Sequence, residues 1–444
     1  MKKISAVVLG YGDRSFCYSK YAFAHPEELE ITGVIDVNPY KLSLAKKRFG
    51  LADEALFNNL DEFLAKNVKC DAVINGTMDN QHYETSVKLL NKGYNVLLEK
   101  PVTSDREQLF EIRDLAESQG CKVVVCHVLR YTPFYRRIKE IIDSGEIGKI
   151  IDLQLNEHVW HGHFVNSYVR GKWRSEKECG SGLLLAKCCH DTDLMCWLNN
   201  ATEPTEVASF GSRAFYTPEN APKNSTEYCY DCPCKDNCMF DAYKFELKMD
   251  CCPQYTWASL DKPTNEITKA EKELFLRKSE YGKCVYKTDM DIVDRQCVSV
   301  NFDNGSIATL NMVGGASKAG RHIHVVCEYG EIIGYIEENK IIYRRFNKNA
   351  VNERYVKDED YYTDEVIFTE ADLSAGNNSV TGHYGGDYYI MRDFVRYLNG
   401  EKTSVSTTKI NDSINSHLIC YAAEESRRTH TVVSLKQRMP EKNY

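Results

Sequence analysis

The stretch ISAVVLGYGDRS, residues 4–15, decides the fold of the first part of this chain. Its apolar start predicts a buried β-strand, which Gly10 and Gly12 follow directly. Glycine permits a tight turn and a close approach of backbone to a pyrophosphate, and the helix that follows presents N–H groups to it. Ser15 occupies the third, small position of this pattern. The stretch therefore predicts the phosphate-binding turn of a dinucleotide site.

A second predicted strand, Ile31–Ile35, ends at Asp36, 24 residues beyond Gly12. A carboxylate at this point accepts hydrogen bonds from the ribose diol of NAD and repels the 2′-phosphate of NADP. We therefore expect NAD as the cofactor, without excluding NADP.

Strands and amphipathic helices alternate through the first 128 residues. Further strands are predicted at Ala72–Asn75, Asn95–Leu98 and Lys122–Cys126, and helices at Tyr40–Phe49, Asn80–Asn91 and Asp105–Ser118. This alternation predicts an α/β Rossmann domain, residues 1–128, with a doubly wound parallel sheet.

Beyond residue 150 the apolar residues alternate with polar ones, as in strands with one wet face. The pattern appears at Ile151–Val159 and at Val298–Phe302, and Asn304-Gly305 is a hairpin signal. We predict an α+β domain with an open, mostly antiparallel sheet over residues 129–444, serving substrate binding and dimerisation. A polar segment rich in cysteine, about residues 217–287, is predicted to be an insertion.

Composition excludes several classes of protein. The 444 residues carry a net charge of -8, which argues against a nucleic-acid partner, and no apolar run is long enough to span a membrane. The N-terminal apolar run is short and is followed by Asp13 and Arg14, unlike a signal peptide. We expect a cytoplasmic protein whose 18 cysteines are reduced thiols or metal ligands.

Glu99-Lys100-Pro101 follows the strand predicted at Asn95–Leu98. A lysine at the carboxyl end of a parallel strand points into the crevice where ligands bind. The alternative is an ordinary lysine on a surface loop.

Together these motifs resemble the Gfo/Idh/MocA family of NAD(P)-dependent sugar and cyclitol oxidoreductases. The matching segments are Gly10-Tyr11-Gly12, Thr77-Met78-Asp79-Asn80-Gln81-His82, Glu99-Lys100-Pro101, Arg130-Tyr131-Thr132-Pro133 and Ser144-Gly145-Glu146-Ile147-Gly148. The resemblance implies that Lys100 orients the substrate oxygen and stabilises negative charge on it. The candidate cofactor contacts are Gly10, Tyr11, Gly12, Asp13, Arg14, Asp36, Thr77, His82, Glu99, Lys100 and Pro101.

The second catalytic element of that family is a helix, which matches Ser181–Leu198 here. His190 matches the family's histidine, but Ala186 stands where the family has an aspartate, and Lys187 follows it. We predict His190 as general acid or base and Lys187 as a second catalytic cation. The alternative is that His190 is a hydrogen-bonded core residue while Lys187 extends to solvent.

Histidines, tryptophan and cations that follow the strand beginning at Ile150 suit a sugar ring with many hydroxyls. The candidate substrate contacts are Arg130, His158, His163, Trp173, Arg174, Asp193 and His383. The histidines could instead hold a metal or lie on an unremarkable sheet surface.

Four cysteines of the insertion, Cys229, Cys232, Cys234 and Cys238, lie within ten residues and are a candidate zinc site. Because the spacing of these four is unusual for zinc, a set such as Cys229, Cys232 and Cys238 with a later cysteine could surround a metal ion more easily. The alternative is a reduced loop without metal.

The sequence predicts hydride transfer between a nicotinamide and a hydroxyl-bearing carbon of a sugar, glycoside or cyclitol. Two alternatives stay open: a redox-neutral, NAD-dependent glycosidase, and a non-catalytic sensor that retains the dinucleotide. We expect a homo-oligomer, because an open sheet face is a natural dimer surface.

Overall fold

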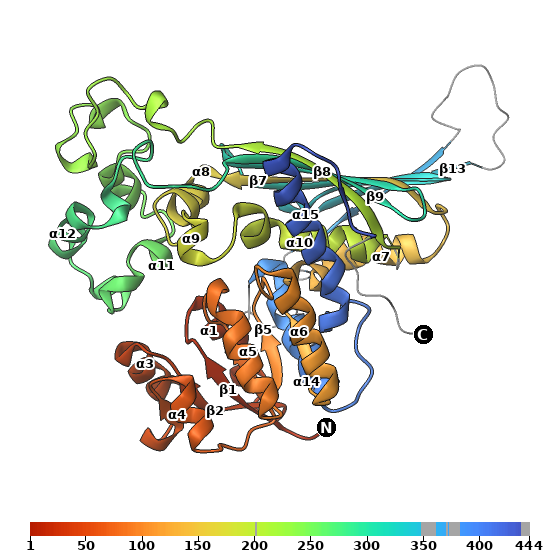
Figure 1. Ribbon diagram of the computed structural model, residues 1–444, viewed down its shortest axis with the longest axis horizontal. Helices are drawn as coiled ribbons and strands as arrows, with labels where there is room; N and C mark the ends of the chain where they lie inside the picture. Colours follow the sequence, from red (N-terminus) through yellow and green to blue (C-terminus); the bar gives the residue numbers. More distant parts are fainter. Residues whose placement is uncertain (200–201, 348–360, 370–371, 373–381, 437–444) are drawn as a thin grey trace.

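The computed structural model describes residues 1–199, 202–347, 361–369, 372 and 382–436. These residues form two sheets, one of six strands and one of nine, with helices between them (Figure 1). The six-stranded sheet has the order β3-β2-β1-β4-β5-β6, and its neighbouring strands are all parallel. Its strands are β1 (Ile4–Leu9), β2 (Leu29–Ile35), β3 (Leu56–Phe57), β4 (Ala72–Asn75), β5 (Asn95–Leu98) and β6 (Val123–Val125).

Both faces of this sheet are buried, as the predicted doubly wound topology requires. Val7 and Leu9 of β1 belong to one apolar cluster, and Ala6 and Val8 belong to another on the opposite face, because successive side chains of a strand point to opposite sides. The helices of this half are α1 (Asp13–Ser19), α2 (Tyr21–Ala24), α3 (Pro39–Phe49), α4 (Leu60–Ala65), α5 (His82–Asn91) and α6 (Arg106–Ser118).

Helix starts follow local capping chemistry. The Asn38 side chain accepts a hydrogen bond from the Tyr40 amide, and Pro39 occupies the first turn of α3. Asp105 caps α6 in the same way, accepting from the Gln108 amide. These residues explain why the predicted helices begin within a few residues of the observed ones.

The end of the chain returns to the first sheet. Helix α14 (Gly386–Leu398) packs Ile390 and Phe394 into the apolar cluster that contains Ala6 and Val8. The strand at residue 124 also forms an isolated bridge with Lys409. The proposed boundary at residue 128 therefore separates the two sheets, while part of the later sequence covers the first one.

The nine-stranded sheet is antiparallel except between β7 and β10, which confirms the mostly antiparallel prediction. Its order is β14-β13-β12-β11-β7-β10-β9-β8-β15. The strands are β7 (Ile150–Trp160), β8 (Pro204–Ser212), β9 (Arg295–Phe302), β10 (Ile307–Ala316), β11 (Gly320–Cys327), β12 (Gly330–Tyr335), β13 (Lys340–Phe346), β14 (Tyr361–Ile367) and β15 (Val433–Ser434).

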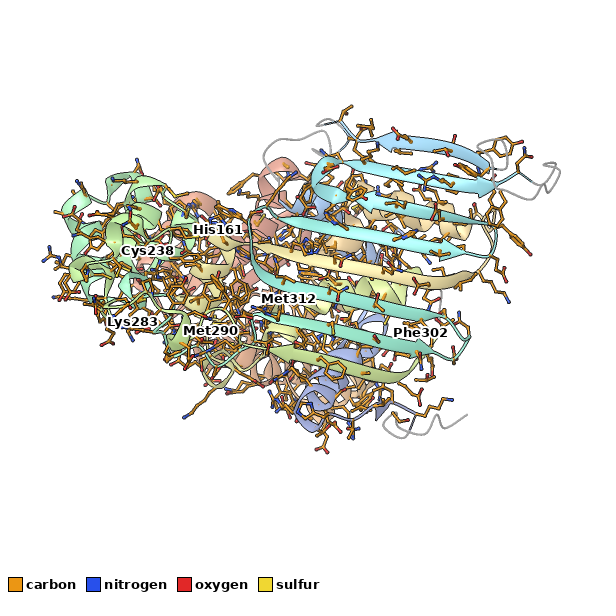
Figure 2. All side chains as sticks on the ribbon, turned by 90° about the horizontal axis from the view of Figure 1, so that it is seen from above. His161, Cys238, Lys283, Met290, Phe302 and Met312 are labelled. Atoms are coloured by element: carbon orange, nitrogen blue, oxygen red, sulfur yellow. The ribbon has the colours of Figure 1, made fainter. Side chains whose placement is uncertain are left out.

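Helices α7 (Pro133–Asp143), α10 (Leu183–Leu198) and α15 (Ile414–Thr429) lie between this sheet and the first one (Figure 1). The opposite face is seen from above in Figure 2, where no helix covers the strands. Ile151, Phe210 and Ile307 are among the exposed apolar residues of these strands. The predicted homo-oligomer stays a prediction.

The chain between β8 and β9 includes residues 217–287, whose assignment as an insertion stays a prediction. It contains α11 (Pro253–Thr256), α12 (Lys269–Lys278) and several short turns, and it lies beyond one end of the sheet (Figure 1). The shorter helices α8 (His161–Phe164) and α9 (Glu176–Cys179) lie at its base. In the described part of the chain, no helix has the length and apolar character of a membrane span.

Candidate active site

The glycine turn after β1 has the geometry that a dinucleotide needs. Gly10 has a φ of +76°, and a Cβ there would lie 2.9 Å from the Gly76 carbonyl oxygen, so only glycine fits. A Cβ at Gly12 would meet no atom within 4 Å, which leaves open space beside the turn. Ser15 is buried against Gly76, where a Cβ would lie 1.9 Å from the serine Oγ. The residues present therefore fit a pyrophosphate held by backbone at this turn.

Asp36 closes β2 beside this turn, as predicted. One carboxylate oxygen accepts a 2.7 Å hydrogen bond from the Tyr11 amide, and the other accepts a 2.8 Å bond from the Asn38 amide. Each oxygen keeps a lone pair for a further donor, such as a ribose hydroxyl. The Tyr11 side chain is buried among Phe16 and Phe49, so this residue offers its backbone alone to a cofactor.

Arg14, a predicted cofactor contact, is instead held by acidic residues. Its guanidinium lies 2.6 Å from Asp387, 3.1 Å from Glu99 and 2.6 Å from the Tyr18 hydroxyl. Burial by itself would raise the pKa of the Asp387 carboxyl, but the charges of Arg14 and His383 hold this pKa well below its usual value. The group joins α1 to α14, so this geometry gives no support to Arg14 as a cofactor contact.

His82 supports the loops around the crevice. Its Nδ1 lies 2.6 Å from the Pro101 carbonyl oxygen, and its Nε2 lies 3.1 Å from that of Thr77. The bond between Lys100 and Pro101 is cis. Since both ring nitrogens already have backbone partners, His82 ties the ends of β4 and β5 together. The assignments of His82, Thr77 and Asp13 as cofactor contacts stay predictions.

Lys100 reaches from the end of β5 to helix α10. Its Nζ donates a 2.7 Å hydrogen bond to the backbone carbonyl of Ala186, one helical turn before His190. Ala186 is the position where the family resemblance expects an aspartate. The lysine therefore contacts a backbone oxygen at the position where the family has a carboxylate. Two of its three N–H donors are left for a ligand.

His190 is buried, with 8% of its surface exposed, and its Nδ1 has no hydrogen-bond partner among the described residues. The centroid of its ring lies 6.5 Å from the ring centroid of His383. Burial, reinforced by the nearby Lys100 charge, lowers the pKa of His190 well below its ordinary value. The imidazole is therefore neutral at physiological pH and able to accept a proton.

His163 and His383 complete the histidine cluster. Burial, together with the charges of Lys187, Arg321, His383 and Lys100, lowers the pKa of His163 to about 3. His383 has a φ of +44°, and its Nδ1 lies 3.2 Å from an Asp387 carboxylate oxygen. Positive φ is uncommon for residues other than glycine, and such strain is concentrated at functional sites. His163 is thus within electrostatic range of Lys187, Arg321 and Lys100, whereas the cation that acts on His383 is Arg14.

Lys187 belongs to a charge network that the sequence did not predict. Its Nζ lies 3.4 Å from Glu157 of β7, and Glu157 in turn lies 2.5 Å from Arg321 of β11. Arg321 also contacts Asp191 of α10 at 3.0 Å. Arg321 was not predicted, since Glu157 and Asp191 are both far from it in sequence. Lys187 is thus partly satisfied by Glu157, and its catalytic assignment stays a prediction.

Arg130 and Asp193, both predicted substrate contacts, pair with each other. Arg130 Nε and Nη2 lie 2.5 and 2.6 Å from the two Asp193 oxygens, and the residues are 3% and 1% exposed. A bidentate pair this deep uses the main hydrogen-bonding capacity of both groups. The geometry indicates a structural role, and their contact with substrate remains unsupported.

The geometry gives no support to His158 as a substrate contact, because this side chain lies on the face of the sheet away from α10. Glu157 faces α10 and contacts Lys187, so the next residue must point to the opposite side of the sheet. There the His158 ring packs 5.4 Å from His322 of β11. Arg174 pairs with Asp289 at 2.7 Å and lies near Glu178 and Glu280, which anchors the insertion rather than the crevice.

Trp173 lies nearer the crevice than Arg174 does. Its indole N–H donates to Asp79 at 3.4 Å, and the Lys172 ammonium lies 4.3 Å from the ring centroid. Burial lowers the pKa of Lys172, a cation that the sequence reasoning missed. Lys172 is within electrostatic range of Asp13, which follows the glycine turn, and of Lys100 at the end of β5.

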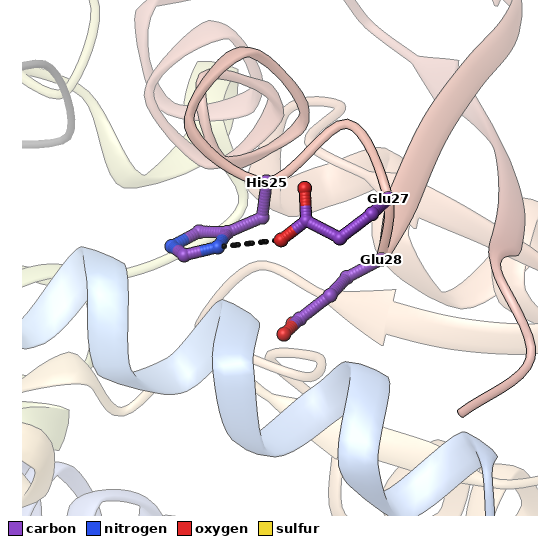
Figure 3. A group of neighbouring side chains, drawn as sticks. All are labelled: His25, Glu27 and Glu28. Carbon is purple, nitrogen blue, oxygen red and sulfur yellow. Dashed lines mark hydrogen bonds and ion pairs between the residues drawn. The ribbon is translucent and has the colours of Figure 1, made fainter.

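Two groups of possible metal ligands lie outside the crevice. His25, Glu27 and Glu28 have ligand atoms within 4.8 Å of one another (Figure 3). His25 already contacts Glu27 at 3.2 Å and Tyr388 at 2.9 Å, while the Tyr21 hydroxyl donates to Glu28 at 2.6 Å. These hydrogen bonds already provide partners for the three side chains, so the group does not require an ion. The second group is the set of predicted cysteines in the insertion, whose metal binding stays a prediction.

Comparisons with known proteins agree with this architecture. Residues 4–127 match the profile of an oxidoreductase family with an NAD-binding Rossmann fold, and residues 135–235 match the GFO/IDH/MocA C-terminal domain. The oxidoreductase YteT of Bacillus subtilis is 27% identical over 376 residues, which cover 82% of this chain and 81% of its own length.

Two solved structures share the fold. The WlbA dehydrogenase from Chromobacterium violaceum, in complex with NADH and UDP-GlcNAcA, has a TM-score of 0.63 at 16% identity, covering 100% of this chain and 98% of its own. Levoglucosan dehydrogenase, in complex with NADH and levoglucosan, has a TM-score of 0.67 at 16% identity, covering 98% and 100%. Such low identity establishes the fold alone.

The glycine turn, Asp36 and the lysine at the end of β5 define an NAD(P)-dependent oxidoreductase with an NAD-binding Rossmann domain. The chain belongs to the Gfo/Idh/MocA family, which confirms the resemblance seen in the sequence.

Proposed function

We propose that this oxidoreductase transfers hydride between NAD and a hydroxyl-bearing carbon of a sugar, glycoside or cyclitol. The observation that carries the proposal is the pairing of Lys100, with two unused N–H donors, and His190, a neutral buried imidazole with an unpartnered Nδ1. A cation that holds an oxygen and a base that takes its proton are what oxidation of a carbinol requires.

The roles follow from charge. NAD, when bound, supplies the acceptor for the hydride of the carbinol carbon. The Lys100 ammonium holds the substrate oxygen and stabilises the negative charge that grows on it. The imidazole of His190 takes the hydroxyl proton, which it can do because its lowered pKa keeps it neutral. In the reverse direction the same proton returns to the oxygen.

Polyhydroxylated rings suit the surroundings of this pair. Lys172, Lys187 and Arg321 supply donors for hydroxyls, and the Tyr255 ring of the insertion lies 5.7 Å from His163. Aromatic faces pack against the C–H faces of sugars while polar groups fix their orientation. The two structural relatives described above were solved with levoglucosan and with UDP-GlcNAcA, which supports this substrate class.

The test is a panel of sugars, keto-sugars, inositols and glycosides, incubated with the full chain and NAD or NADH while nicotinamide absorbance is followed. We expect turnover that Lys100→Met lowers about 10³-fold and that Lys69→Met, at an exposed lysine, leaves intact. No turnover of any member would overturn the proposal. Cleavage of a glycoside without net NADH would replace it with the redox-neutral alternative.

A further inference from the structure

The chain between β8 and β9 joins the main apolar core through residues such as Phe240, Phe245 and Val285, and its outer part has only a small apolar cluster of its own. Its separate apolar cluster contains three buried residues, Trp257, Ile267 and Leu276. Small units that cannot bury enough apolar surface are usually stabilised by disulfides or by a metal. All 18 cysteines of the chain are described, and every one is a free thiol. Disulfides therefore do not stabilise this unit, and its cysteines are available for another purpose.

Five of these cysteines line a single pocket. Cys229, Cys232, Cys234 and Cys238 come from one loop, and Cys284 joins them from the far end of the insertion. Figure 2 shows Cys238 and Lys283, the neighbour of Cys284, both within the insertion. Cys284 is thus a later cysteine of the kind that the spacing of the first four favours as a further ligand, and it lines the same pocket.

Backbone pairing explains how Cys284 arrives there. Tyr228 and Lys283 form an antiparallel bridge, and the Cys284 amide donates a 2.8 Å hydrogen bond to the Glu227 carbonyl. The bridge places Cys284 opposite Glu227, two residues before Cys229, and the side chains of Cys229 and Cys284 line the same pocket. Only 6% and 8% of their surfaces are exposed, so both thiols are withdrawn from solvent.

Four of the five sulfurs form a consistent ligand set. Cys229 and Cys232 have the two-residue spacing of structural zinc sites, on a tight turn in which the Cys232 amide donates to the Cys229 carbonyl at 3.3 Å. Cys238 follows one further turn along the loop. Cys234 differs in degree, because its sulfur lies 3.3 Å from the Lys223 carbonyl oxygen, whereas the Cys229 sulfur makes a longer contact of 3.8 Å with the Lys283 carbonyl oxygen.

The surroundings can balance the charge of such a centre. Four thiolates around a divalent zinc carry two net negative charges. The Arg170 guanidinium lies 3.6 Å from the Cys229 sulfur, and Lys235 lines the pocket. Arg170 is 1% exposed and also donates to the Phe240 carbonyl at 2.7 Å, so its position is fixed by the fold. Hydrogen bonds from outer residues of this kind orient the ligands of metal sites.

We propose that Cys229, Cys232, Cys238 and Cys284 bind one zinc ion as four thiolates, with Cys234 outside the ligand set. Binding releases the thiol protons to solvent, with no change of oxidation state. No three of these sulfurs lie within 4.8 Å of one another in the described structure, so the ion draws them inward. The centre joins the two ends of the insertion and is independent of the hydride-transfer function.

The test is elemental analysis of the full chain, purified without chelator from zinc-supplemented medium. We expect about one zinc per chain in the wild type and in the matched control Cys234→Ser. Cys284→Ser should lose most of the zinc, and Cys284→His, which keeps a zinc ligand, should retain it. Absence of stoichiometric zinc, or loss in Cys234→Ser with retention in Cys284→Ser, would overturn the proposal.

A second measurement does not depend on how the variants fold. Wild-type protein is treated with an alkylating reagent before and after zinc is removed by a chelator, and modified cysteines are identified by mass spectrometry. We expect Cys229, Cys232, Cys238 and Cys284 to become reactive together after removal, while Cys234 reacts equally in both states. Equal reactivity of all five in both states contradicts a zinc site.

Discussion

Two residues on the same face of the molecule's central helix, His190 and Asp193 of α10, have opposite surroundings. Both are nearly buried, at 8% and 1% exposed. Both Asp193 oxygens are bound by Arg130, whereas His190 Nδ1 has no partner among the described residues. Burying an unpaired polar atom costs free energy, so it persists where a ligand completes it. We call Arg130 and Asp193, which bind each other, the closed pair, and His190, whose Nδ1 is unpaired in the described part of the chain, the open group. The closed pair is expected to govern stability and the open group to govern catalysis.

The largest effect is expected where the closed pair is broken. Arg130→Met leaves the Asp193 carboxylate buried without its cation, which should reduce the free energy of unfolding by about 3–5 kcal/mol. Urea denaturation of the full chain measures this. Adding Asp193→Leu should recover most of the loss, because an apolar pair replaces the ionic one. Unchanged stability with reduced turnover would instead assign Arg130 to the substrate.

Lys100→Met removes the cation proposed to hold the substrate oxygen. We expect kcat to fall about 10³-fold, since a lost electrostatic stabiliser of the transition state has effects of this order. Steady-state kinetics measure the change, with Lys69→Met as the control. The urea midpoint should stay close to that of the wild type. A variant that kept its rate would remove Lys100 from the mechanism.

His190→Asn removes the proposed base while keeping a polar side chain of similar size. We expect kcat/KM for oxidation to fall about 10²-fold, at the lower end of the range for general acid–base catalysis. Because the pKa of His190 is lowered, the wild-type rate should hold down to pH values below the ordinary histidine pKa of about 6.5. The pH–rate profile tests this, and the variant should lose the acid limb. An unaltered profile would point to another base.

Asp387→Asn tests the network that holds His383 near the open group. The lowered pKa of Asp387 means that its contribution to stability is present above the unfolded carboxyl pKa of about 3.9 and is lost as pH falls through the folded pKa. At neutral pH we expect a loss of about 2 kcal/mol, discounted because Arg14 is partly exposed. In urea denaturation, the variant and the wild type should therefore differ in free energy of unfolding at neutral pH, and this difference should shrink as the pH is lowered. A gap that is independent of pH would contradict this account.

Local patterns predicted much of the fold. Five of the predicted strands of the first sheet are present, because buried parallel strands are marked by short apolar runs. The two-residue strand β3 escaped prediction, since it is too short to show a period. In the second sheet β8, β12, β14 and β15 were not predicted; Gly211 and Gly334 interrupt the patterns of β8 and β12.

The candidate site was predicted less evenly. Lys100 and His190 were found because each belongs to a motif with a defined place on a strand end or a helix. For His158 the sequence could not show which face of the sheet meets α10, because the strand carries polar residues on both faces. Arg321 was missed because its partner Asp191 lies 130 residues away in sequence.

The sequence by itself determined the glycine turn, the acid after the second strand, the order of strands and helices, and the family. Each of these depends on neighbouring residues or on a short period. Only the tertiary structure decided which polar groups are paired and which are open, and it alone brought Cys284 beside Cys229. Such decisions depend on contacts between distant segments, and the same residue types in sequence are compatible with either outcome until packing selects the partner.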